Sequence, residues 1–224
     1  MYQPACCRRP ESGAVGLPTP SARAGGRCRA VGAPALGALV LAGGAARRMQ
    51  GQNKALLRLE GRTFLERLAE AFDGFDERLI STNDASFAAG SPFVPVADRT
   101  PGRGPLEGLA SALTVCKSDG LVVAACDMPL FSADLARFLA QAAQGHPAAA
   151  CEDRAGRLHP LCGVYMKTCL PALDAALGQG RLRMMDAFYA IGGAAVPLGG
   201  TAFADSVLTN INTPDALEKL IDTP

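Results

Sequence analysis

Four short, strand-like runs, three of them apolar throughout, constrain the fold of this chain more than any other feature of its sequence. They span residues 36–41, 78–82, 93–97 and 121–126. The segments between the runs carry apolar residues at helical spacing. In the first such segment these residues are Leu65, Leu68, Ala69 and Phe72. Regular alternation of strand and helix predicts βαβ units, right-handed crossovers and a mostly parallel sheet.

Small or polar residues stand at the end of each run. They are Gly43, Asn83, Asp98 and Asp127. In parallel α/β sheets, ligands bind at the carboxyl ends of the strands. The sequence therefore predicts that these residues share one site.

The loop after the first run, LAGGAARRMQGQNK, suits a polyanionic ligand. Gly43 and Gly44 let backbone N–H groups approach a phosphate closely, and Arg47 and Lys54 add positive charge. The loop is not a Walker A motif, because Lys54 is followed by alanine rather than by Ser or Thr. It also lacks the dinucleotide pattern G-x-G-x-x-G.

In this signature, LAGGxxxRMxGxxK, the chain resembles the molybdenum cofactor guanylyltransferases, and the resemblance extends over about residues 36–222. It implies a three-layer αβα, Rossmann-like nucleotidyltransferase domain with a mostly parallel central sheet. We expect this single domain to occupy residues 36–224, after a disordered tail of residues 1–35. That tail holds five prolines, five glycines and five arginines against one acidic residue, and it has no apolar period.

The resemblance also implies a nucleotide site. Its nucleotide-binding positions are Leu41, Ala42, Gly43, Gly44, Lys54, Asn83, Asp98 and Asp127. Asp127 corresponds to the ligand of Mg²⁺, the implied cofactor, and a carboxylate held at the end of a central strand suits that ion. Arg47, Lys54 and Asp127 are the candidate catalytic residues. From the residues alone, Asp127 could instead cap a turn, and Asn83 and Asp98 could be ordinary strand-end turn residues.

The C-terminal half is less regular, and its pattern predicts a strand over 161–166, a helix over about 168–178 and a last helix that starts at Pro214. The acceptor side is expected in this half of the chain. The candidates are His159, Arg181, Asn210 and Asn212, which lie in segments that match family motifs in kind. Asn210 and Asn212 alternate about Ile211, so both project from one side of an extended segment. Taken alone, His159 could be an ordinary turn histidine and Arg181 a solvated residue at the start of a helix.

The implied reaction is transfer of GMP from GTP to the terminal phosphate of molybdopterin, with release of pyrophosphate. GTP and molybdopterin are the implied partners, with molybdoenzymes or their chaperones as candidate recipients. One alternative is a cytidylyltransferase for the same cofactor or a sugar-phosphate nucleotidyltransferase. Another is a molybdopterin-binding carrier without activity, in which Gln50 and Asn53, where the family usually has Gly and Asp, would mark decay.

The composition excludes several other classes of protein. A net charge of +1 gives no sign of a nucleic-acid surface, and no apolar run is long enough to predict a membrane span. The eight cysteines form no C-x-x-C pair, and several of them lie in apolar runs. We therefore expect free thiols and a cytoplasmic location.

Overall fold

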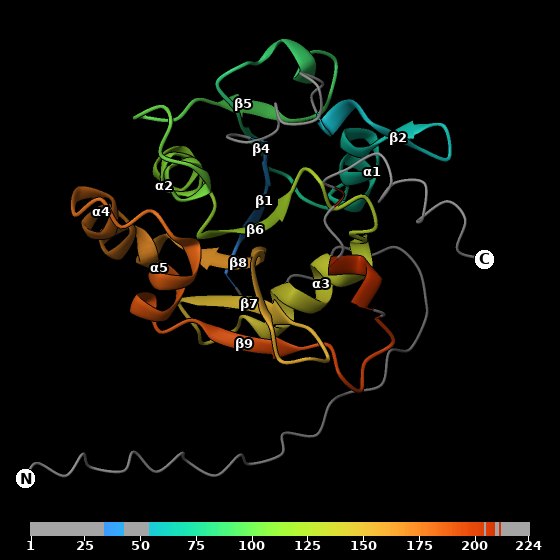
Figure 1. The fold of residues 1–224 in the computed structure, drawn as a ribbon. Helices are drawn as coiled ribbons and strands as arrows, with labels where there is room; N and C mark the ends of the chain where they lie inside the picture. Colours follow the sequence, from blue (N-terminus) through green and yellow to red (C-terminus); the bar gives the residue numbers. More distant parts are fainter. Residues whose placement is uncertain (1–33, 43–53, 204, 209–210, 212–224) are drawn as a thin grey trace, which may run out of the picture. The chain divides into compact units, whose positions relative to one another are not determined.

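The computed structural model describes residues 34–42, 54–203, 205–208 and 211 of the chain. A seven-stranded sheet runs through them in the order β5-β4-β1-β6-β8-β7-β9 (Figure 1). Its strands are β1 (Leu36–Leu41), β4 (Arg78–Ser81), β5 (Val94–Val96), β6 (Gly120–Ala125), β7 (Ala148–Glu152), β8 (Leu158–Met166) and β9 (Ala194–Pro197). β8 is antiparallel to its neighbours β6 and β7, and the other four pairings are parallel. The prediction of a mostly parallel sheet is confirmed.

Helices cover both faces of this sheet and make three layers. They are α1 (Phe64–Ala71), α2 (Pro105–Val115), α3 (Ala133–Ala142), α4 (Leu170–Gly178) and α5 (Met184–Ile191). α2, α4 and α5 lie on one face, and α1 and α3 lie on the other (Figure 1). Successive side chains of β1 point to opposite faces of the sheet and so contribute to two separate cores. Val40 packs on the α1–α3 side and Leu39 on the α2–α4–α5 side.

Local signals in the sequence explain where several of these elements begin. Ser132 caps α3 by accepting a hydrogen bond from the N–H of Leu135 at 3.2 Å, as its position predicts. Thr63 and Glu66 form a capping box at the start of α1. Pro105 occupies the first turn of α2. Pro95 lies in β5, an edge strand, where a missing backbone donor is tolerated.

The C-terminal half differs from the sequence prediction in two respects. The strand predicted over 161–166 begins earlier, at Leu158, and β9 was not predicted at all. β9 is only four residues long and follows two glycines, so its pattern is weak. The helix predicted over 168–178 is present as the 3₁₀ turn η4 (Lys167–Cys169) followed by α4.

Several smaller elements complete the description. They are the hairpin of β2 (Arg58–Leu59) and β3 (Arg62–Thr63) and the 3₁₀ turns η2 (Lys54–Leu56), η3 (Ser86–Ala88) and η5 (Asp205–Leu208). The helix predicted from Pro214 and nearly all of the predicted tail lie outside the described residues. Among the residues that the structure does describe, no helix has both the length and the apolar character to cross a membrane.

Glu77 ties the start of β4 to the loop between α2 and β6. Its carboxylate accepts hydrogen bonds from the N–H groups of Lys117 and Ser118, at 2.8 and 2.9 Å, and from the Ser118 hydroxyl at 2.6 Å. Partial burial acts to raise the pKa of Glu77, but these hydrogen bonds outweigh it and lower that pKa below the ordinary value of 4.5.

We therefore expect Glu77→Gln to lower the free energy of unfolding by about 1 kcal/mol at pH 7. A lowered carboxyl pKa contributes stability above the ordinary value and loses it as the pH falls through the folded-state pKa. The difference between variant and wild type should thus shrink below about pH 4.5. Urea unfolding at several pH values measures it, with Glu70→Gln at an exposed ion pair as control. A difference that is constant with pH would contradict the assignment.

Candidate active site

The carboxyl ends of four parallel strands stop at the same level of the sheet. Leu41 is in register with Ser81 on one side and with Ala125 on the other, and Ser81 is in register with Val96. Backbone hydrogen bonds continue past these ends, since the N–H of Ala42 donates to the carbonyl of Ser81 at 3.0 Å. The predicted positions that the structure describes at this edge therefore come together. They are Leu41, Ala42, Asn83, Asp98 and Asp127.

Asp127 and Lys54 form an ion pair at the centre of this edge. The distance between Lys54 Nζ and Asp127 Oδ2 is 3.2 Å, and the two side chains are 8% and 15% exposed. Asp127 follows the fully buried strand β6, and Lys54 begins the turn η2. A lysine so shielded from water is costly to maintain without anionic partners. The pair thus places a fixed positive and a fixed negative charge next to each other.

The second oxygen of Asp127 has no such partner. Oδ1 is buried, and among the described residues it has no hydrogen-bond partner. An unsatisfied, buried carboxylate oxygen is costly, and it is the donor atom that a divalent cation of the Mg²⁺ type prefers. No cluster of three or more acidic, histidine or cysteine side chains capable of holding a metal occurs in the described part of the chain. Asp127 would therefore hold a cation together with oxygens of the substrate.

The neighbouring thiol of Cys126 is not activated as a nucleophile. Burial, followed by the charge of Asp127, raises the pKa of Cys126 to about 12. The thiol is therefore protonated at neutral pH and cannot act as a thiolate.

The C-terminal segment reaches Asp127 through Ile211. Its backbone N–H donates to the carbonyl of Asp127 at 2.9 Å, and its side chain is fully buried against Leu59 and Phe64. Ile211 stands between the predicted acceptor residues Asn210 and Asn212, which lie outside the described residues. The contact shows that this part of the sequence returns to the edge where the strands end.

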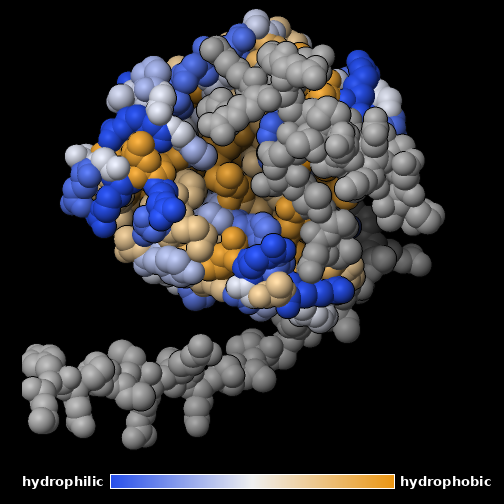
Figure 2. Space-filling model, in the orientation of Figure 1, coloured by the Kyte–Doolittle hydropathy of each residue, from blue (hydrophilic) through white to orange (hydrophobic). Residues whose placement is uncertain are grey.

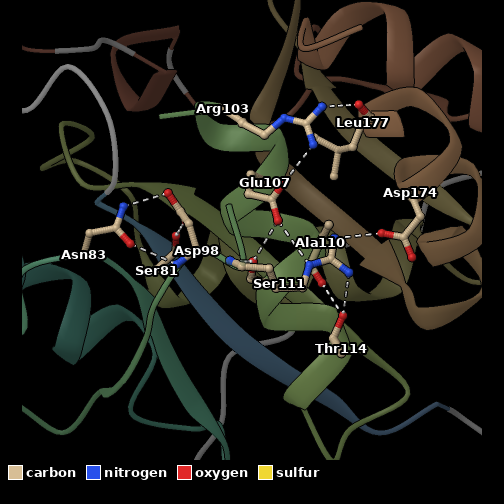
Figure 3. Close-up of polar contacts among 11 residues, drawn as sticks. Ser81, Asn83, Asp98, Arg103, Glu107, Ala110, Ser111, Thr114, Asp174 and Leu177 are labelled. Carbon is tan, nitrogen blue, oxygen red and sulfur yellow. Dashed lines mark hydrogen bonds and ion pairs between the residues drawn. The ribbon is translucent and has the colours of Figure 1, made fainter. Parts of the chain in front are cut away.

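Asn83 and Asp98 pair with each other beside Ser81 (Figure 3). Asn83 Nδ2 donates to Asp98 Oδ2 at 2.8 Å, and the N–H of Asp98 donates to Asn83 Oδ1 at 3.0 Å. Ser81 Oγ donates to Asp98 Oδ1 at 3.5 Å. A Cβ on Gly108 would lie 2.2 Å from Ser81 Oγ, so only glycine lets α2 approach β4 this closely. The amide and carboxylate are half-buried to exposed, and both can exchange partners with a bound nucleotide.

The loop after Asp98 is fastened to the helical layer by a buried carboxylate, Glu107 (Figure 3). Glu107 is 2% exposed, and it accepts from Arg99 Nε at 3.1 Å and pairs with Arg103 Nη1 at 3.7 Å. Arg99 also donates to Asp174 of α4 at 2.7 Å. The hydrogen bond to Asp174 comes first among the causes that raise the pKa of Arg99. This network was not foreseen from the sequence, because its members lie on three separate elements.

A cavity of about 600 Å³ opens next to Met128, the residue after Asp127. Its lining comes from the start of α2, the residue after Asp127, the start of β8 and the start of α5. The lining residues are Pro105, Met128, Leu158, His159, Pro160, Leu161, Cys162, Leu182, Arg183, Met184, Met185 and Asp186. Figure 2 shows a hollowed area with apolar surface near the middle of the face that it draws.

The reversed direction of β8 brings His159 to this cavity. Cys162 of β8 is in register with Ala124 of β6, so the start of β8 lies next to the end of β6. The predicted acceptor residue Arg181 is exposed and is not among the described residues that line the cavity. Arg183, two positions later, lines it instead. Both arginines lie in the segment that is predicted to start a helix, and only the structure shows which of the two lines the cavity.

Three predicted residues of the glycine-rich loop, Gly43, Gly44 and Arg47, lie outside the described residues. The strand before this loop and the lysine after it lie at one edge of the sheet, as described above. A model of the MobA-like NTP transferase domain matches residues 38–191, which include both. The chain belongs to this family.

Relatives of the family support the assignment over most of the chain. A molybdenum cofactor guanylyltransferase of Cereibacter sphaeroides is 37% identical over 187 residues, which cover 81% of this chain and 93% of that protein. A probable molybdenum cofactor guanylyltransferase of Carboxydothermus hydrogenoformans is 31% identical over 185 residues, with the same two coverages.

The fold is shared with a solved structure. The crystal structure of molybdopterin-guanine dinucleotide biosynthesis protein A from Archaeoglobus fulgidus matches with a TM-score of 0.70. It is 24% identical, and the match covers 82% of this chain and 96% of that one. The three-layer nucleotidyltransferase fold implied by the sequence is thereby confirmed.

Proposed function

We propose that this MobA-like chain is a molybdenum cofactor guanylyltransferase, which transfers GMP from GTP to the terminal phosphate of molybdopterin and releases pyrophosphate. The observation that carries the proposal is the buried Lys54–Asp127 pair with its unsatisfied carboxylate oxygen, at the strand ends of a domain related to named guanylyltransferases.

Nucleotidyltransferases of this family generally use a divalent metal, and we propose Mg²⁺ held by Asp127. When bound, the ion would neutralise charge on the reacting phosphate. The protein's own contribution is position and charge, because phosphoryl chemistry asks for little covalent work. Lys54 supplies a fixed cation beside the phosphates, and Arg47 is the proposed second one.

The nucleotide and the acceptor take different parts of this edge. We assign the nucleotide to Leu41, Ala42, Asn83 and Asp98, with the two glycines Gly43 and Gly44. Guanine presents N–H donors on its Watson–Crick edge, which suits the carboxylate of Asp98 or the amide oxygen of Asn83. We assign the acceptor to the cavity beside Asp127, which His159 lines, with Arg181, Asn210 and Asn212 as further candidates.

The decisive experiment is pyrophosphate release by purified protein supplied with Mg²⁺ and molybdenum-loaded molybdopterin. GTP, CTP, ATP and UTP are offered separately. We expect the rate with GTP to exceed that with each other nucleotide by at least about 100-fold, because a site built to hydrogen-bond one base leaves its polar groups unpaired with another. Equal or higher release with CTP would reassign the protein as a cytidylyltransferase. If no pyrophosphate is released with any nucleotide although the protein binds molybdopterin, the protein would be a molybdopterin carrier and not a nucleotidyltransferase.

Two finer statements belong to the same proposal. The guanine dinucleotide product would pass to molybdoenzymes or their chaperones. We also propose a cytoplasmic location, which is supported by five buried, free cysteines among the described residues. They are Cys116, Cys126, Cys151, Cys162 and Cys169.

A further inference from the structure

A buried carboxylate that plays no part in the nucleotide site lies behind His159. Asp153 follows β7 and opens the hairpin that leads to β8, and its side chain is 2% exposed. Its two oxygens have different partners. Oδ1 accepts the backbone N–H groups of Ala155 and Arg157, both at 2.9 Å. Oδ2 accepts from Arg157 Nε at 2.7 Å and lies 3.2 Å from His159 Nε2.

The two carboxylate oxygens of Asp153 therefore have different roles. Oδ1 closes the hairpin turn through backbone groups, which any residue with an acceptor at that position could do. Oδ2 contacts only side chains among the described residues, and one of them, His159, lines the cavity. A turn residue needs the first set of contacts and has no need of the second.

The protonation of Asp153 decides which nitrogen of His159 carries the proton. The hydrogen bond from the N–H of Arg157 comes first among the causes that lower the pKa of Asp153, ahead of the opposing effect of burial. The carboxylate is therefore ionised at neutral pH and can only accept hydrogen bonds. Nε2 of His159 must then be the donor, and in a neutral ring Nδ1 keeps a free lone pair. Within the described part of the chain, no hydrogen bond uses Nδ1.

We propose that Asp153 is a positioning residue that holds His159 in the Nε2–H form, so that Nδ1 accepts a hydrogen bond from a ring N–H of the acceptor in the cavity. This inference rests on the proposed function, because it takes the cavity as the acceptor site.

The chemistry of the cavity favours a flat heterocycle over a phosphate at this position. A lone pair on Nδ1 attracts an N–H donor, whereas a phosphate dianion offers acceptors only. The lining around His159 includes the thioethers of Met128, Met184 and Met185, which pack well against the face or edge of an aromatic ring. A pterin ring has both the flat face and the N–H donors that these residues would contact.

Nitrogen NMR of the histidines tests the first step without any enzymatic reaction. The tag-free chain contains two histidines, and the exposed His146 serves as an internal reference for His159. At about pH 8, where an ordinary imidazole is neutral, we expect His159 in the Nε2–H form. In Asp153→Asn, Oδ1 can still accept the turn N–H groups, but an NH₂ group replaces Oδ2. We then expect the Nδ1–H form. An Nδ1–H ring in the wild type, or the same form in both proteins, overturns the proposal.

Titration with 6-hydroxymethylpterin and, separately, with inorganic phosphate tests the second step. We expect the pterin to shift the Nδ1 resonance of His159, and its affinity to fall about tenfold in Asp153→Asn and in His159→Gln. His159→Gln keeps a donor for Asp153, but its acceptor is the oxygen of a flexible amide and not a ring nitrogen held in place by the imidazole. A shift caused by phosphate and not by the pterin would overturn the proposal in favour of an anion subsite.

Two further variants separate positioning from general stability. Arg157→Ala removes the other side-chain partner of Oδ2 and keeps the backbone N–H, so we expect the wild-type tautomer and affinity. The double variant Asp153→Asn/His159→Gln should bind the pterin no more weakly than either single variant, and additive losses would contradict the proposal. If Asp153→Asn fails to fold, the wild-type tautomer and His159→Gln still decide the question. If the protein releases no pyrophosphate with any of the four nucleotides while His159 still has the Nε2–H form, that result would refute the proposed reaction and leave the proposal for Asp153 in place.

Discussion

Replacing Asp127 by Asn is expected to lower turnover by at least about 100-fold, the typical loss when one preorganised charge is removed from a reacting centre. The substitution keeps the shape of the side chain and removes the negative charge from an oxygen that has no hydrogen-bond partner among the described residues. Steady-state release of pyrophosphate with GTP and molybdopterin measures the effect.

Asp127→Asn should also destabilise the fold, because it leaves the ammonium group of Lys54, which is 8% exposed, opposite a neutral amide. Breaking a buried pair in this way costs about 3 kcal/mol. For a domain of this size, that loss corresponds to a fall in Tm of about 6 to 12 °C in the absence of metal, so turnover is measured well below the Tm of the variant. The control is Asp119→Asn at the other end of β6, where the carboxylate accepts from the N–H of Ala35. Near wild-type turnover in Asp127→Asn would refute the assignment of Asp127.

Replacing Lys54 by Met is expected to affect stability as well as activity. The ammonium group is 8% exposed and lies 3.2 Å from Asp127 Oδ2. Its removal leaves a poorly solvated carboxylate with no cation paired to either oxygen among the described residues, and breaking such a buried pair costs about 3 kcal/mol. Urea unfolding in the absence of metal measures this loss, with Lys117→Met at an exposed lysine as control.

Mg²⁺ should restore part of the stability that Lys54→Met loses. A ligand that binds only the folded state stabilises it, and the benefit increases with affinity. An unpaired Asp127 should bind the cation more tightly than one already neutralised by lysine. We therefore expect Mg²⁺ to raise the Tm of the variant by more than that of the wild type. Equal shifts in the two proteins would count against Asp127 as the metal ligand.

The N-terminal half of the fold could be predicted because its signals are local. The strands are short and mostly apolar, α1 and α3 begin at side-chain caps, α2 begins at Pro105, and the alternation predicts parallel pairing. That reasoning also placed Asn83, Asp98 and Asp127 at one edge, where the structure has them. The family resemblance added the identity of the substrates, which no spacing of residues contains.

The remainder of the site depends on contacts that sequence patterns do not encode. The Lys54–Asp127 pair joins residues 73 positions apart, and Arg99 and Asp174 are 75 positions apart. Arg181 and Arg183 lie in the same short segment, and nothing in the sequence favours one over the other. Only the path of the chain into α5 shows that Arg183 lines the cavity. Asp153 could have been suspected as a turn residue, but nothing in its neighbourhood indicates that its second oxygen reaches a histidine.

Under the proposed assignment, the reversed strand β8 would allow the two substrates to be recognised by separately variable parts of one domain. The proposed nucleotide site uses loops that leave parallel strands in the first half of the chain, whereas the proposed acceptor site uses a strand that enters the sheet from the β7–β8 hairpin. Residues 153–157 of that hairpin can change in length or sequence without altering the ends of β1, β4, β5 or β6. Exchanging the hairpin between relatives should therefore move acceptor preference while leaving the choice of nucleotide intact. Such independence would let one scaffold diversify its acceptors while the phosphate chemistry stays fixed.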